Sequence, residues 1–233
     1  MTTFLKTHQE LSPLQDTTVE NLQAEFARKC YLKLPKFFQD TIFSILKEEA
    51  FDLLERHARR KDFIMEETES TKRHISTVSG NKVKMHSSFI PALYENKVMI
   101  EHLEDIAGEK LFLTPDPADR HAVHRLHRQG DIHGGHVDDY AFVLIMCLEA
   151  PNADQGGEIE FVPNSTNIKD LGTSKSLIDR LEVGDAYFMR SNKAVHRVLP
   201  LKEDTNRTVV VFTYADLETK NISVSYSSDS LYD

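Results

Sequence analysis

The chain has 233 residues, of which 40% are hydrophobic and 28% are charged, and these values exclude a collagen-like, coiled-coil or wholly disordered chain. Its formal net charge of −9 at pH 7 repels phosphate backbones and anionic membranes, so neither nucleic acid nor a membrane is an expected partner. No apolar stretch reaches the roughly 18 residues of a membrane span, and residues 1–10 lack the apolar core of a secretory signal. Cys30 and Cys147 lie where buried free thiols are expected, which favours a soluble, cytoplasmic protein.

Helices are predicted to dominate the first part of the chain, residues 1–116. Apolar residues at helical spacing predict helices over Thr17–Cys30, with Thr17 or Thr18 as N-cap, and over Asp40–Arg59. We expect these helices to support one face of the structure that follows.

The segment between residues 56 and 110 is predicted to contain a loop, then two short strands and then a helix. Its charged beginning, residues 56–73, is interpreted as a solvated helix end and loop. Short apolar runs predict strands over His74–Val78 and Val83–Ile90, and Pro91–Lys110 again predicts a helix that closes at Gly108.

After Pro117 the pattern changes to short apolar runs separated by turn residues, which is typical of an antiparallel β-sandwich or barrel. We therefore predict one mainly β domain with a helical N-terminal half, a β core over residues 117–216 and a C-terminal tail over 217–233, of which the polar residues 223–233 are expected to be disordered. The expected strands are Ala122–His127, Tyr140–Glu149, Gly157–Val162, Ala186–Arg190, Ala194–Leu199 and Arg207–Tyr214.

Histidines are concentrated in residues 121–136, where five of the chain's eleven occur. In an extended segment the side chains of His136 and Asp138 lie on the same side, so both can reach one cation. Taken alone, the pair also fits a half-exposed His–Asp contact. His196, on a later strand, would complete two histidines and one carboxylate, a set typical of non-haem Fe(II) with open coordination positions.

Arg207 opens the apolar strand TVVVFTYA. An arginine that points into the mouth of a β-barrel can bind a carboxylate with two parallel hydrogen bonds. A surface charge at a strand end is the other interpretation of this residue.

These features occur in one order: H-x-D, the hairpin GGEIEFVP, the strand GDAYFMR, a histidine, and then R-T. In that order, over Asp119–Ala215, the chain resembles the Fe(II)/2-oxoglutarate-dependent oxygenases. The resemblance implies a double-stranded β-helix, or jelly-roll, core. It also implies Fe(II) held by His136, Asp138 and His196, 2-oxoglutarate bound by Arg207, and O2 as co-substrate.

The run HRLHRQGDIHGGHVDD and the helical first half resemble the branch that hydroxylates or halogenates free amino acids, notably lysine. In the halogenating members of that branch, glycine or alanine replaces the metal-binding acid and leaves room for chloride. Because Asp138 is present here, the resemblance favours hydroxylation.

The same resemblance places substrate contacts three residues before and three after the first iron histidine. These are His133 and Asp139, and the further candidates are Arg73, Asp119 and Thr213. Carboxylates would hold an ammonium group and Arg73 an α-carboxylate, which fits a cationic amino acid. Asp139 also fits a turn, Asp119 a cap, and Arg73 a surface cation.

Three histidines at steps of three, His121, His124 and His127, fall on alternating sides of a strand. We interpret His121 and His124 as structural or exposed, and His127 as a neighbour of the co-substrate. Tryptophans close the site near the C-terminus of the related lysine halogenases, but this chain has none, and Tyr226 or Tyr232 are the available aromatic residues.

The predicted function is hydroxylation of an unactivated C–H bond of a free cationic amino acid, lysine first, with Fe(II), 2-oxoglutarate and O2. One alternative is hydroxylation of a peptide or protein side chain. Another is a cupin-like metal-binding module without oxygenase activity, which would not need Arg207.

Overall fold

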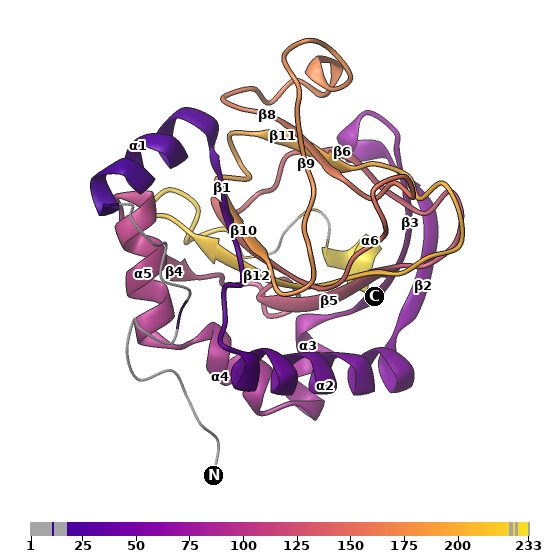
Figure 1. Ribbon diagram of the computed structural model, residues 1–233, viewed down its shortest axis with the longest axis horizontal. Helices are drawn as coiled ribbons and strands as arrows, with labels where there is room; N and C mark the ends of the chain where they lie inside the picture. Colours follow the sequence, from indigo (N-terminus) through magenta and orange to yellow (C-terminus); the bar gives the residue numbers. More distant parts are fainter. Residues whose placement is uncertain (1–10, 12–17, 224–225, 227, 233) are drawn as a thin grey trace.

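A long, curled antiparallel sheet forms the centre of the protein, and helices pack against its outer face (Figure 1). The computed structural model describes residues 11, 18–223, 226 and 228–232. The predicted absence of a signal segment falls on residues 1–10, which lie outside this range. None of the helices in the described part of the chain combines the length and the apolar character that crossing a bilayer requires.

Three of the predicted helices are confirmed in outline. Helix α1 (Val19–Lys29) begins at Thr18, whose hydroxyl accepts a hydrogen bond from the Asn21 amide, and α2 spans Asp40–His57. Helix α5 (Lys97–Ala107) ends where Gly108 takes φ +71°, a left-handed conformation that glycine adopts without strain.

The predicted strand over Val83–Ile90 is wrong, because this segment belongs to two short helices. Helix α3 spans Gly80–His86 and α4 spans Phe89–Tyr94. The Ser79 hydroxyl caps α3 by accepting a hydrogen bond from the Lys82 amide. The apolar residues that indicated a strand instead pack between the helices and the sheet.

The strands follow one another across the sheet in an order that mixes early and late parts of the chain. One half, which we call the long-strand half, consists of β1 (Tyr31–Leu34), β10 (Ala186–Met189), β7 (Phe142–Glu149), β12 (Arg207–Ala215), β5 (His121–Leu126) and β3 (Thr71–Val78). The other half, the short-strand half, consists of β6 (Ile132–His136), β11 (Val195–Val198), β8 (Ile159–Val162) and β9 (Leu177–Asp179). Strand β2 (Arg59–Met65) pairs with β3, and β4 (Phe112–Leu113) pairs with β12.

Strands β7 and β12 are buried on both faces because their residues alternate between two apolar cores. Leu144 and Met146 face the helices, whereas Val143 and Ile145 face the interior of the curled sheet. Burial on both faces explains why these strands are continuous apolar runs in the sequence.

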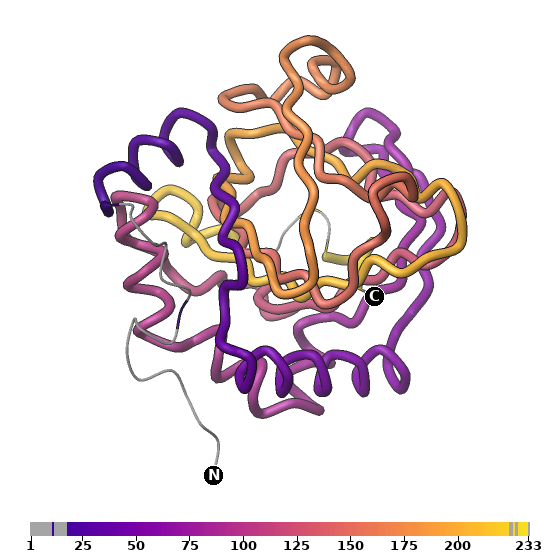
Figure 2. Tube along the Cα trace, viewed as in Figure 1, coloured from indigo at the N-terminus to yellow at the C-terminus, as the bar shows by residue number. Residues whose placement is uncertain are grey.

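The sheet curls because β3 pairs with β5 near its end and with β6 near its beginning. At the opposite side, Tyr31 of β1 stacks on Phe161 of β8 with ring centroids 4.4 Å apart, and its hydroxyl donates to Asp179 of β9 at 2.8 Å. The two halves therefore face each other across an interior space, which confirms the predicted jelly-roll class. The connection between β8 and β9 projects from the body of the molecule (Figure 2).

Two predictions about irregular segments are wrong. The charged residues 56–73, interpreted as a helix end and loop, contain β2, the 3-10 turn η2 (Glu66–Thr68) and the start of β3. The tail is ordered at Tyr226 and in the short helix α6 (Ser228–Tyr232), while residues 224, 225, 227 and 233 lie outside the described range.

Candidate active site

A cavity of about 840 Å³, its open mouth included, lies between the two halves of the sheet. Apolar side chains of β7, β8 and β12 form its base, and charged or aromatic polar side chains project into it. Its polar lining consists of Arg73, Asp119, His124, His133, His136, Asp138, Tyr187, His196, Arg207, Thr213, Tyr226 and Tyr232.

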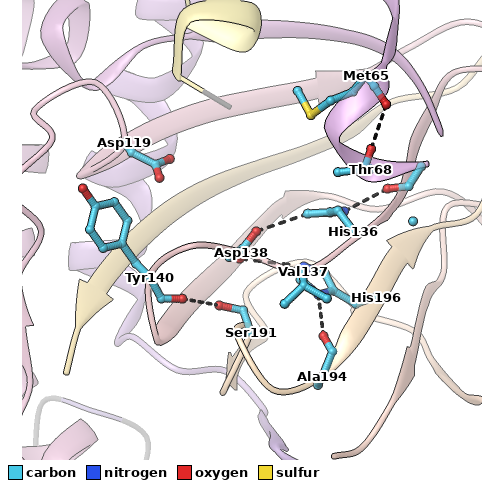
Figure 3. A network of polar contacts seen from close by, with 12 residues as sticks. Met65, Thr68, Asp119, His136, Val137, Asp138, Tyr140, Ser191, Ala194 and His196 are labelled. Atoms are coloured by element: carbon cyan, nitrogen blue, oxygen red, sulfur yellow. Dashed lines mark hydrogen bonds and ion pairs between the residues drawn. The ribbon is translucent and has the colours of Figure 1, made fainter. Parts of the chain in front are cut away.

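His136, Asp138 and His196 meet in this cavity, as the sequence predicted, with one donor atom of each within 4.8 Å of the others. The Nε2 atoms of His136 and His196 lie 3.4 Å and 3.9 Å from the Asp138 carboxylate oxygens (Figure 3). The two histidines are directly paired across β6 and β11, so their rings project side by side.

Backbone carbonyls orient both imidazoles. Nδ1 of His136 lies 2.8 Å from the Gly134 carbonyl, and Nδ1 of His196 lies 2.9 Å from the Ala194 carbonyl. If each Nδ1 carries the hydrogen and donates it, each Nε2 presents its lone pair toward Asp138. The donor set of two imidazoles and one carboxylate fits Fe(II).

Burial, together with the neighbouring His196 and Arg73, holds the pKa of His136 well below its usual value and keeps the imidazole neutral. Burial also raises the pKa of Asp138, although His196 and a hydrogen bond from Ser191 oppose this effect. Bringing Asp138 into the cavity therefore costs free energy that a bound cation would offset.

A β-bulge in β6 allows His133 and His136, three residues apart, to face the same cavity. His196 is opposite His136, but Val198 is opposite His133, so three steps on β6 match two on β11. Gly134 makes the bulge possible because a Cβ atom there would lie 2.7 Å from the Lys72 carbonyl oxygen. The sequence HGGH carries no strand-forming residues, which explains why β6 was not predicted.

Arg207 lines the cavity from the first position of β12 and is 7% exposed. Its Nε donates to the Gly157 carbonyl at 2.8 Å. No carboxylate of the described chain lies within ion-pair distance of its guanidinium, so the group is available to an anion in the cavity.

Arg73 is a second buried arginine in the cavity wall, with 1% exposure. Its terminal nitrogens contact Thr71, Thr68 and Met65, and its Nε has no partner. Burial without a carboxylate partner lowers its pKa to about 10. The structure thus excludes the interpretation of Arg73 as a surface cation.

Asp119 faces the cavity together with His124 and Tyr232. The Tyr232 hydroxyl lies 3.1 Å from His124 Nε2 and 3.4 Å from Asp119 Oδ1. Burial, with Asp138 and Asp116 nearby, raises the pKa of Asp119 to about 7. No cationic side chain in the described ranges pairs with this carboxyl.

The remaining predicted residues separate into two groups. His133 and Thr213 line the cavity, and the His133 ring stacks on His136 at a centroid distance of 4.5 Å. Asp139 does not line it, and its carboxylate accepts a hydrogen bond from the Tyr226 amide at 2.7 Å. His127 lies on the other side of β5, near Asp131.

Sequence reasoning missed His124 and Tyr187, and it named Tyr226 and Tyr232 as available aromatic residues but preferred a disordered tail. The alternation along β5 was correct, but His124, rather than His127, is on the inward side. Tyr226 reaches the site by donating its hydroxyl hydrogen to the Val137 carbonyl at 2.8 Å. The apolar neighbours Ala122 and Leu126 share the inward side with His124 and were the available signal.

A family model described as HalD, Halogenase D, matches residues 14–232. No curated protein matches the sequence.

Solved structures of low sequence identity share the fold. The non-haem α-ketoglutarate-dependent epimerase SnoN from nogalamycin biosynthesis matches with a TM-score of 0.66 and 17% identity, over 85% of this chain and 80% of that chain. A prolyl 4-hydroxylase from Phytophthora capsici matches with a TM-score of 0.63 and 14% identity, over 94% of this chain and 68% of that chain. HygX from Streptomyces hygroscopicus was solved with nickel, 2-oxoglutarate and hygromycin B bound. It matches with a TM-score of 0.59 and 14% identity, over 86% of this chain and 88% of that chain.

Proposed function

The chain belongs to the Halogenase D family, and we propose that it is an Fe(II)- and 2-oxoglutarate-dependent hydroxylase of a free cationic amino acid, with lysine as the preferred substrate. The observation that carries the proposal is the Asp138 carboxylate, which lies within 4 Å of both His136 and His196 in a cavity with two arginines that form no ion pair with the described residues.

In this proposal His136, Asp138 and His196 hold the metal, and Arg207 binds the distal carboxylate of 2-oxoglutarate. Bound iron and 2-oxoglutarate would supply, with O2, the oxidising power to replace one hydrogen of an unactivated carbon by hydroxyl. The two neutral imidazoles present their Nε2 lone pairs, and Asp138 supplies the single negative charge of the ligand set. Asp138 would be a metal ligand where the halogenating relatives have glycine or alanine, which favours hydroxylation.

The remaining cavity groups complement a zwitterion with a cationic side chain. Among the residues that the structure describes, Arg73 has an unpartnered Nε and no carboxylate partner, and it would bind the α-carboxylate. Asp119 has no cationic partner in the same part of the chain, and it would bind the side-chain ammonium with Tyr232 beside it. His133 and Thr213 line the space between and would contact the amino acid backbone.

Enclosure of the cavity supports a small substrate over a protein side chain. Leu231 and Tyr232 of α6 form part of the wall, and both are under 10% exposed. A peptide would have to displace this segment, which is held by the hydrogen bond from Thr77 to the Leu231 carbonyl. Arg207 distinguishes the proposal from a cupin-like metal binder, which has no use for a buried cation next to the metal.

The test is incubation of Fe(II)-loaded protein with 2-oxoglutarate, air and single free amino acids, followed by mass spectrometry. The proposal expects one added oxygen on lysine that depends on 2-oxoglutarate. Oxygen added only to a peptide, or no 2-oxoglutarate consumption with any substrate, would contradict it.

A further inference from the structure

One threonine outside the cavity touches both the arginine at its wall and the strand that carries the metal-site histidine. Thr71 begins β3, where the tight β2–β3 connection brings it beside β6. Its Oγ1 lies 2.8 Å from Nη1 of Arg73 and 2.9 Å from the carbonyl oxygen of Gly135. Gly135 directly precedes His136 in the chain.

The contacts of Thr71 with Arg73 and Gly135 each have one possible donor. A guanidinium only donates, so Thr71 accepts from Arg73, and a carbonyl only accepts, so Thr71 donates its single hydroxyl hydrogen to Gly135. Thr68 Oγ1 lies 2.6 Å from the same Thr71 oxygen and 3.2 Å from the Met65 carbonyl, so its one hydroxyl hydrogen can serve only one of these two contacts. A hydroxyl that accepts from a cation is a stronger donor in turn, which strengthens the bond to Gly135.

The Gly135 carbonyl lies in the bulge of β6, where the pairing with β11 is irregular. The neighbouring Gly134 carbonyl makes a different contact, with Nδ1 of His136. A Cβ atom on Gly134 would lie 2.8 Å from Cβ of Thr71, so the backbone of β6 packs directly against the Thr71 side chain here. The hydroxyl of Thr71 therefore bonds the peptide between Gly135 and His136 at the point where the pairing of β6 with β11 is irregular.

We propose that Thr71 is a positioning residue whose one hydroxyl orients both the Gly135–His136 peptide of the metal site and the Arg73 guanidinium of the substrate site. The metal part of this inference stands on the triad alone. The substrate part rests on the proposed function, through the role given there to Arg73.

Replacing Thr71 should therefore weaken metal binding and substrate binding together. Removing the hydroxyl frees the Gly135 carbonyl, so His136 is held less well for the metal, and groups that orient a metal ligand are worth about 10- to 100-fold in affinity. The same change removes one of the contacts that hold Arg73, and one hydrogen bond corresponds to about fivefold in affinity for a carboxylate ligand.

The experiment compares the full chain with Thr71→Val, which keeps the shape, and Thr71→Ser, which keeps the hydroxyl. Thr208→Val is the matched control, because the Thr208 hydroxyl also accepts from an arginine, Arg125, and donates to an oxygen, on Glu149, but away from the triad. The measurements are Mn(II) affinity in the absence of amino acid, and lysine affinity at saturating Mn(II), both by calorimetry. Thermal unfolding checks that each variant is folded.

We expect Thr71→Val to weaken Mn(II) binding by about tenfold or more and lysine binding by about fivefold. Thr71→Ser should restore both, and Thr208→Val should leave Mn(II) affinity unchanged. Unchanged Mn(II) affinity in folded Thr71→Val would overturn the inference, and so would an equal loss in Thr208→Val, which would indicate a general effect of removing a hydroxyl. Loss of Mn(II) affinity with unchanged lysine affinity would overturn the dual role. If the unmodified chain binds no lysine, the proposed substrate fails, and the Mn(II) result alone decides the role of Thr71.

Discussion

Strands β7 and β12 differ from β6 and β11 in regularity and in what they present to the cavity. The first pair keeps its register over six residue pairs, from Tyr214–Phe142 to Val209–Cys147, shifts only at its end next to Thr208, and turns apolar residues to both faces. The second pair meets at His196–His136 and Val198–His133 around a bulge, and it carries the histidines. We therefore expect the long-strand half to contribute most to stability, and we expect replacement of the proposed metal ligands, which lie beside the bulge, to cost the fold little.

The largest expected effect is the loss of hydroxylated product in the variant Asp138→Gly. Hydroxylated product should fall by at least about 100-fold, since a metal ligand is expected to matter more than the groups that orient it. The unfolding free energy of the metal-free protein should stay within about 1 kcal/mol, because burial of this carboxylate does not stabilise the fold without metal.

Product is measured by mass spectrometry and stability by urea unfolding. Full activity in the variant would show that the triad is misassigned. A large loss of stability would show that this half of the sheet is not separable from the fold.

Arg207→Ala, at the start of β12 in the long-strand half, should have the next largest effect. The 2-oxoglutarate concentration needed for half-maximal rate should rise about 100-fold, because a buried cation paired with a carboxylate is lost. Mn(II) affinity should be unchanged, since Arg207 does not contact the triad. Titration of 2-oxoglutarate checks the first value, and an unchanged requirement would contradict the assignment.

Leu144→Ala tests the long-strand half from its outer face. Leu144 is fully buried between β7 and the helices, and the cavity left by truncation should cost about 3 to 5 kcal/mol of unfolding free energy. Val198→Ala on β11 removes less buried surface and should cost about 1 to 2 kcal/mol. Urea unfolding of the two variants compares the halves directly, and equal losses would contradict the division of roles.

Lysine binding should depend on pH through Asp119. Its pKa of about 7 means that the carboxyl is neutral below that pH and negative above it, so affinity for an ammonium should rise from pH 6 to pH 8, by up to about tenfold. His124 has a pKa of about 4 and stays neutral, and the Tyr232 pKa is raised well above this range by burial.

Calorimetry on the metal-free protein measures this dependence. Asp119→Asn should abolish the dependence and weaken binding at pH 8. A lysine affinity that is independent of pH in the unmodified protein would show that Asp119 is not the ammonium site.

The smallest expected effect is the difference in Mn(II) affinity between alanine substitutions at the two glycines of the bulge, Gly134 and Gly135. A Cβ atom at Gly134 would meet the Lys72 carbonyl oxygen, which belongs to paired backbone, whereas one at Gly135 would meet the flexible Leu171 side chain. Gly134→Ala should therefore weaken Mn(II) binding about tenfold, as a displaced ligand support does, and Gly135→Ala should weaken it less. The reverse order, measured by calorimetry, would contradict the described packing.

Sequence reasoning was most successful where one strand or helix carries its own pattern. Strands β7 and β12 were predicted because burial on both faces makes them apolar throughout, and α5 because Gly108 marks its end. Strand β2 was missed because it is a charged edge strand, and β6 because its glycines are required by contacts with Thr71 and Lys72, which lie distant in sequence.

The site shows the same division. The H-x-D pattern and the later histidine brought the triad residues together correctly, because their placement follows from strand alternation. Asp139 and the tail could not be placed, since Tyr226 reaches Asp139 only through the folded chain. His124 was assigned to the wrong side because alternation gives two sides and only the packed sheet shows which one is inward.

The most direct test of the central claim is the amino acid panel with Fe(II)-loaded protein, 2-oxoglutarate and air, run on the unmodified chain beside Asp138→Gly. The account predicts one oxygen added to lysine by the unmodified chain, in step with succinate formation, and none by the variant. Absence of both oxygen addition and succinate formation from the unmodified chain across the panel would contradict it.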